Sequence, residues 1–243
     1  MKDILQDIVA HTHSLGFLPL VKVSGDAKTT SIESMADDRS VIVSATAHKP
    51  VVEFKGTFGM PNLDKLNLHL KNPEYKENAK INVVEADRNG TIVPTGLHFE
   101  NAVGDFQNDY RFMNSDIINE KLKSVKFKGA SWEVEFQPTM SAIGRLKLQA
   151  EAHNEESVFQ VRTEDGNLVV FFGDAASHAG SFVFQANVGG KLKHTWSWPV
   201  TQVRSILNLG GKITMKIADA GAMQITVDSG IAEYNYILPA QSK

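Results

Sequence analysis

The strongest constraint in this sequence is a repeated passage from a strand-like segment through a proline into a short helix-like segment. The passage occurs in GTFGMPNLDKLNLHLKN around Pro61 and again in WSWPVTQVRSILNLGG around Pro199, 138 residues later. A further helix-like segment begins near residue 2 and a comparable one near residue 139, at almost the same spacing. Unrelated domains would rarely share both the order and the spacing, so the chain is expected to contain one structural unit twice.

Four segments have apolar residues at the spacing of an amphipathic helix. Pro61, Pro138 and Pro199 stand where three of these helices can begin, because proline is tolerated in the first helical turn. The Gly210-Gly211 pair can end the last one. The sequence therefore predicts helices in residues 2–15, 61–71, 138–153 and 199–208.

Most of the remaining sequence has the β-branched residues and the partial alternation that are typical of antiparallel strands. Asn89-Gly90 and Asp165-Gly166 favour two-residue hairpin turns, and Gly189-Gly190 separates two further strand-like runs. Each half is thus predicted to contain a helix, four strands, a second helix and three or more strands. The clearest strands of the first half are 18–25, 28–35 and 39–47.

The polar stretch 114–126, which has only isolated apolar residues, is expected to connect the two halves. A length of 243 residues suits two small domains, with the boundary near residue 123. The expected fold class is α+β, with two helices packed on antiparallel sheets in each domain. The predicted domains are 1–123, which includes the connector, and 124–243.

Composition excludes several classes of function. The chain has no cysteine, so disulfides and thiolate metal sites are excluded, and a formal charge of −3 is unlike that of a strongly basic nucleic-acid-binding domain. No apolar run approaches the roughly 20 residues that span a bilayer, and the amphipathic first residues lack the apolar region of a signal peptide. A cytoplasmic protein without membrane contact is expected. Scattered histidines and an incomplete phosphate-loop pattern in LGGKIT predict no metal and no cofactor.

The order of elements resembles that of the polymerase sliding clamps, and it is most similar to the processivity clamps of tailed phages, which carry two such units per chain. The resemblance covers essentially the whole chain. It is clearest in GNLVVFFGDAASHAGSFVFQANV, HTWSWPVTQVRSILNLGGKITMKI and GAMQITVDSGIAEYNYILPAQ, within residues 166–240. The resemblance implies duplicated DNA-clamp domains and a viral, non-enzymatic protein in the cytoplasm of an infected bacterial host.

The function that the resemblance implies is that of a DNA polymerase processivity factor. This family closes a ring from six units, so two units per chain imply a head-to-tail homotrimer. The ring encircles duplex DNA without reading its sequence, tethers the polymerase and is placed on DNA by an ATP-driven clamp loader. The strand 106–113 is expected to pair with the strand 180–187 of the next chain.

The resemblance also places the helices around the hole, where cations would contact phosphates. Together with the acids on the same segments, the helical cations give a balance of +2 in a chain of −3, which is the sign expected for a basic lining in an acidic body. Ordinary solvated helix faces would give a similar balance, so this alternative stays open. The candidate DNA-binding residues are Lys2, Lys65, Lys71, Arg145, Lys147 and Arg204.

A docking pocket for partner tails is implied on the outer side of the clamp near the connector. The matching stretches are SDIINEKLK in the connector and YNYILPAQSK at the end of the last strand. Alternatively, Ile117 and Leu122 simply pin the connector to the sheet. The candidate pocket residues are Ile117, Ile118, Leu122, Tyr236, Leu238 and Pro239.

Two other functions remain open from the sequence. One is a duplicated β-rich structural or assembly protein of a virion. The other is a hydrolase that uses Asp174, Ser177 and His178 in the loop 173–180, although nearness in sequence does not make a catalytic site. Trp196 and Trp198 alternate with polar residues and are expected in the core, with a stacking platform for single strands as the alternative.

Overall fold

A computed structural model describes residues 1–88, 90–123, 127, 129–176 and 178–241 of the chain. The chain divides into two compact units. Unit 1 is Met1–Val125 with Ser229–Tyr234, and unit 2 is Lys126–Asp228 with Asn235–Lys243. The predicted domains 1–123 and 124–243 stay a prediction, since residues 124–126 lie outside the described residues.

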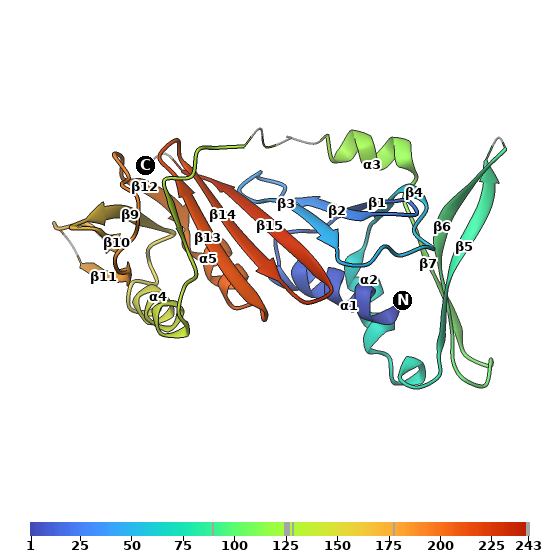
Figure 1. Ribbon diagram of the computed structural model, residues 1–243. Helices are drawn as coiled ribbons and strands as arrows, with labels where there is room; N and C mark the ends of the chain where they lie inside the picture. Colours follow the sequence, from blue (N-terminus) through green and yellow to red (C-terminus); the bar gives the residue numbers. More distant parts are fainter. Residues whose placement is uncertain (89, 124–126, 128, 177, 242–243) are drawn as a thin grey trace. The chain divides into compact units, whose positions relative to one another are not determined.

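Unit 1 contains antiparallel sheets, the packed helices α1 and α2, and the short helix α3 (Figure 1). The sheets have the strand orders β4-β1-β2-β3 and β5-β6-β7. In chain order its elements are α1 (Lys2–His11), the 3-10 turn η1 (His13–Leu15), β1 (Val21–Gly25), β2 (Thr30–Met35), β3 (Ile42–Ala47), β4 (Gly56–Met60), α2 (Leu63–Lys71), the 3-10 turn η2 (Pro73–Tyr75), β5 (Lys80–Arg88), β6 (Thr91–Glu100), β7 (Gln107–Arg111) and α3 (Ser115–Lys121).

The core of unit 1 forms where α1 and α2 pack together on the strands. Leu5, Ile8 and Leu66 are fully buried, as their spacing on amphipathic helices requires. The segment Ser229–Tyr234 completes this unit. The Tyr234 hydroxyl donates to the Asp7 carboxylate at 2.8 Å, and the Ser229 hydroxyl donates to the same oxygen at 3.1 Å.

Unit 2 repeats this plan with strand orders β15-β14-β13-β8 and β11-β10-β9-β12. Its apolar core gathers side chains of α4, α5 and both sheets, including Leu146, Val161, Val203 and Ile217. Its elements are β8 (Val134–Phe136), α4 (Met140–Ala152), β9 (Val158–Glu164), β10 (Asn167–Gly173), β11 (Ala179–Gln185), β12 (Trp196–Pro199), α5 (Val200–Leu207), β13 (Lys212–Ala218), β14 (Ala222–Asp228) and β15 (Ala232–Pro239).

The predicted duplication is confirmed by the order of elements. A helix, four strands, a helix and three strands occur from α1 to β7 and again from α4 to β15. The predicted α+β class with antiparallel sheets is confirmed as well. Strand β8 precedes the second copy and has no counterpart before α1 in the described chain.

The hairpin signals had different outcomes. Asp165-Gly166 joins β9 to β10 with left-handed backbone angles, φ 46° and 75°, as a two-residue hairpin requires. The paired ends Arg88 and Thr91 flank the other predicted turn, of which Asn89 lies outside the described residues. Gly189-Gly190 is not a hairpin, because β11 pairs with β10 while β12 pairs with β9. A Cβ at Gly190 would clash with the backbone oxygen of Glu133, so glycine serves a close backbone approach there.

The connector contains a helix that the sequence interpretation missed. The Asn114 side chain accepts a hydrogen bond from the Ile117 backbone N–H, which caps the first turn of α3. An isolated bridge between Met113 and Gly59 holds the segment between β7 and this helix against β4. The polar composition of this stretch is explained by α3, a short helix that buries only one side, with Ile118 on the buried side.

Candidate nucleic-acid interface

Helix α2 presents a row of exposed side chains opposite its buried face. Leu63, Leu66 and Leu70 are buried, so Lys65, Leu68 and Lys71, three residues apart, share the exposed side. Leu68 is 67% exposed between the two lysines. The helix therefore offers two cations to an anionic ligand, with an exposed apolar side chain between them.

His69 adds no charge to this surface at neutral pH. Its ring is half-buried, 5.1 Å from the ring of Phe99. Burial, with a smaller contribution from the Lys65 ammonium, lowers the pKa of His69 below its ordinary 6.5. Any anion attracted to α2 at neutral pH thus responds to the lysines.

Lys2 differs from the other predicted contacts because it is already engaged. Its half-buried ammonium donates a 2.6 Å hydrogen bond to the backbone oxygen of Tyr75, which ties α1 to η2. The charge of Lys2 still contributes to the field around the helix pair, but its side chain is the least free of the six to follow a ligand.

Unit 2 carries the other predicted cations on its own helix pair. On α4, Arg145 and Lys147 are exposed while Ile143 and Leu146 are buried. Arg204 is half-buried on α5, which packs against α4. Within the described part of the chain, no ion-pair partner is found for five of the six predicted cations. These five are Lys65, Lys71, Arg145, Lys147 and Arg204.

The predicted pocket residues of the connector hold α3 on unit 1. Ile118 is fully buried and Leu122 is 8% exposed, whereas Ile117 is 44% exposed. Ile118 packs into the space left by Gly59, where an added Cβ would lie 2.8 Å from the Ile118 Cδ1 atom. Among these three predicted pocket residues, Ile117 is thus the one with a side chain available to a ligand.

The predicted pocket residues of the tail are mostly part of the core of unit 2. Tyr236 and Leu238 are fully buried, and the Leu238 backbone oxygen accepts a 3.2 Å hydrogen bond from the Trp198 indole. Trp198 is fully buried, as expected, whereas Trp196, which was expected in the core too, is half-buried. Pro239 is exposed. The pocket stays a prediction, in which Ile117 and Pro239 are the members with exposed side chains.

The loop 173–180 shows no catalytic arrangement among its described residues. Asp174 and His178 are exposed, and Asp174 accepts a 2.6 Å hydrogen bond from the Ala176 backbone N–H. Ser177 lies outside the described residues. Where the chain is described, no three histidine, aspartate or glutamate residues gather to hold a metal ion, and no helix is long and apolar enough to cross a membrane.

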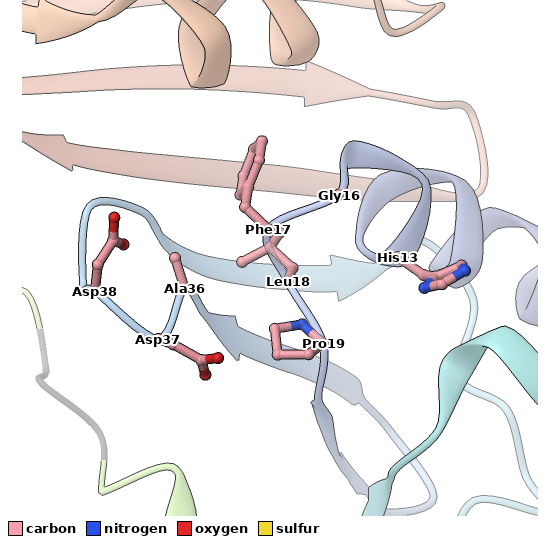
Figure 2. Close-up of a pocket in the computed structure, with 8 residues that line it drawn as sticks. All are labelled: His13, Gly16, Phe17, Leu18, Pro19, Ala36, Asp37 and Asp38. Carbon is pink, nitrogen blue, oxygen red and sulfur yellow. The ribbon is translucent and has the colours of Figure 1, made fainter. Parts of the chain in front are cut away.

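Sequence reasoning missed a hollow of about 440 Å³ in unit 1. Figure 2 shows Asp37 and Asp38 on the turn after β2, the segment Phe17–Pro19 facing that turn, and His13 beyond it. The two walls are some twenty residues apart in sequence, so no local pattern predicts that they meet. The adjacent aspartates Asp37 and Asp38 in a turn were the one feature of the sequence that could have pointed to a binding site here.

Comparison with solved structures identifies the fold. The chain is similar to the PCNA of Thermococcus kodakaraensis with a TM-score of 0.70 at 12% identity, over 99% of this chain and 97% of that one. It is similar to the PCNA of A. fulgidus, solved with the C-terminal region of FEN-1, with a TM-score of 0.69 at 12% identity, over 100% and 95% of the two chains. No protein family and no curated protein matches the sequence itself. The chain thus has the duplicated α+β fold of PCNA-like sliding clamps.

Proposed function

We propose that this protein is a DNA polymerase processivity factor, a ring-shaped sliding clamp that encircles duplex DNA and tethers the polymerase. The observation that carries the proposal is the likeness to PCNA chains over nearly the full length of both proteins. Such a protein acts by topology. It raises the effective concentration of polymerase at the primer end without making or breaking a bond, so it is not an enzyme and needs no cofactor.

The exposed helix faces suit duplex DNA of any sequence. Each unit has a helix pair that carries cations without ion-pair partners in the described chain, and an ammonium or guanidinium group is attracted to any phosphate. The whole chain is acidic at −3, so attraction is confined to these local cations. Weak contacts of this kind hold DNA without fixing the protein at one site.

We propose further that the ring is a homotrimer of the phage type, closed by strands β7 and β11. Each is an edge strand in its sheet, and an unpaired edge is a template for pairing with another chain. Asp109 and Arg111 on β7 and Ser181 and Val183 on β11 have exposed side chains that such pairing would cover. A clamp loader on another chain would open the ring, in the cytoplasm of an infected bacterial host.

The test is retention on DNA of different topology. The labelled protein is loaded on a nicked circular duplex with a cognate clamp loader and ATP, and the DNA is washed at high salt. The amount of DNA-bound protein is measured before and after a single restriction cut that linearises the circle. A clamp stays on the circle and leaves within minutes of linearisation, because only the ends release it. Equal retention on circles and on cut DNA would contradict the proposal, and so would a particle that sediments only as a monomer at micromolar concentration.

A further inference from the structure

The hollow beside the turn after β2 has the form of a preformed binding site. Its walls are held by backbone hydrogen bonds, Ala36 N–H to the Val41 oxygen at 2.9 Å and Gly16 N–H to the His13 oxygen at 3.0 Å. The Ser34 hydroxyl donates to the Leu20 oxygen at 2.7 Å and joins the two walls. A ligand would therefore bind without first ordering the chain, which lowers the cost of association.

The lining combines an apolar floor with an acidic rim. Leu18 and Ala36, which are 1% and 2% exposed, form the floor of the hollow. Above the floor, the Phe17 ring is half-buried and the Pro19 ring is exposed. A volume of about 440 Å³ accommodates one or two large side chains. The apolar part alone would accept many ligands, so the rim decides which one is favoured.

The rim carries two carboxylates. Asp38 accepts hydrogen bonds from the Ser40 hydroxyl at 2.6 Å and the Ser40 N–H at 2.9 Å. These bonds lower the pKa of Asp38 and keep it ionised. Asp37 is exposed and has no bonding partner among the described residues. Across the hollow lies His13, and no lysine or arginine stands among the lining residues that the structure describes.

We propose that this hollow docks a short segment of a partner protein in which a lysine or arginine stands next to a large apolar residue. The cation would lie at the acidic rim formed by Asp37 and Asp38, and the apolar side chain would cover Leu18 beside Pro19. The same carboxylates repel phosphate, so nucleic acid is excluded from this site. The site is separate from the helix faces proposed to meet DNA, and the inference stands whether or not the chain closes into a ring.

The test uses four fluorescein-labelled seven-residue peptides with the central pairs Arg-Phe, Lys-Leu, Glu-Phe and Arg-Ser in an Ala-Gly context. Anisotropy gives the dissociation constants, and amide chemical shifts of the full-length protein locate the site. The Arg-Phe and Lys-Leu peptides are expected to bind and to shift the amides of Leu18, Ala36 and Asp37. The Glu-Phe peptide, which lacks the cation, and the Arg-Ser peptide, which lacks the apolar residue, are each expected to bind about tenfold more weakly. The reason is that the cation matches the acidic rim and the apolar residue matches the floor of the hollow.

Matched variants distinguish an effect of the two rim aspartates from the effect of removing any surface carboxylate. Asp37→Asn with Asp38→Asn keeps the shape of the turn and is expected to weaken Arg-Phe binding about tenfold. Asp26→Asn is the control, because Asp26 is an exposed aspartate that accepts backbone hydrogen bonds in the turn at the other end of β2. The inference is overturned if the double variant binds as tightly as the parent, if the Glu-Phe peptide or a DNA oligonucleotide binds as tightly as Arg-Phe, or if the shifted amides lie elsewhere.

Discussion

His69 shows how one residue reports the environment of the α2 surface. Burial is the larger cause of its lowered pKa and Lys65 the smaller one. We therefore expect Lys65→Met to raise the pKa of His69 while leaving it below 6.5, and Lys71→Met to leave it unchanged. Titration of the imidazole protons by NMR measures both. A pKa above 6.5 in the parent protein would contradict the described burial.

The same shift has a consequence for stability. The folded state binds a proton at His69 less readily than the unfolded chain, so the free energy of unfolding falls as pH decreases through the unfolded value of about 6.5. The loss is expected to be smaller in Lys65→Met than in the parent. Urea unfolding at pH 7.5 and pH 5.5 gives both differences, and an equal pH dependence in the two proteins would remove Lys65 as a contributor.

Ile118 and Ile117 are neighbours with opposite environments, which makes them a matched pair. Ile118 is fully buried against Gly59, whereas Ile117 is 44% exposed. Ile118→Ala is expected to lower the free energy of unfolding by about 2–5 kcal/mol, the usual cost of a large-to-small change in a core. Ile117→Ala is expected to change it by less than about 0.5 kcal/mol. Similar effects of the two variants in urea unfolding would contradict the placement of α3.

At the scale of elements, the last strand shows what the sequence could have predicted. Ala232, Tyr234, Tyr236 and Leu238 alternate with less buried residues, and all four are fully buried. That period of two is the signature of one strand face on a core. The pocket for partner tails that includes Tyr236 and Leu238 stays a prediction, and the burial of both side chains shows that they also belong to the core of unit 2. A Leu238→Ala and Ile118→Ala variant is thus expected to lose stability before it reports on partner binding.

Some other elements are determined by residues close to them in sequence, and others by residues far away in sequence. Pro61, Pro138 and Pro199 stand one or two residues before α2, α4 and α5 begin, not in the first turns as predicted. They are still a local signal that a helix starts nearby, so these helices were predictable. The separation of β11 from β12 depends on β9, which precedes both strands and takes β12 as its partner. The acidic hollow likewise joins walls from separate stretches. Local patterns carry no information about such pairings.

The edge strands support a prediction about assembly. The strand pairs described in this fold are antiparallel. Antiparallel pairing of β7 with β11 of another chain would bring Arg111 close to the beginning of β11 and the nearby Asp174. Arg111→Glu is expected to raise the concentration at which the assembly dissociates about tenfold, because it places like charges together. Asp174→Lys in the same chain should restore assembly.

The measurement for this prediction is sedimentation across a dilution series, with Lys28→Glu as an exposed control in a distant turn. Equal dissociation of Arg111→Glu and Lys28→Glu would place the contact elsewhere. Proline at Phe184 is a poor alternative, because Phe184 is 5% exposed and its ring lies 5.8 Å from that of Phe136. That change would disturb the core of unit 2 together with the edge.

The helix pairs support a prediction about processivity. Charge reversal of Lys65, Arg145 and Arg204 is expected to reduce the length of product made per polymerase binding event, since the surface offered to phosphate becomes acidic. Unfolding by urea should change little, because Lys65 and Arg145 are exposed. Unchanged product length would remove these residues from the interface. The matched control reverses three exposed cations outside the helix pairs, Lys28, Lys49 and Lys191.

At the scale of the whole molecule, net charge decides how the protein meets open DNA. With −3 overall, binding to linear duplex is expected to be weak and to fall steeply with salt. The slope of log affinity against log salt should lessen by about 0.9 for every phosphate contact removed by a neutral Gln at Lys65, Arg145 or Arg204. Fluorescence anisotropy from 50 to 200 mM salt measures the slope, and an unchanged slope would mean that the phosphates are contacted elsewhere.

The bond between Tyr234 and Asp7 has a consequence for how the protein is made. Unit 1 begins at the start of the chain, yet it needs Ser229–Tyr234 to supply the donors for the buried Asp7 carboxylate. A ribosome therefore releases almost the entire second unit before the first can be finished. Until then the Asp7 carboxylate of the nascent first unit lacks the hydroxyl donors of Ser229 and Tyr234, so the last step in folding of unit 1 follows the synthesis of β14.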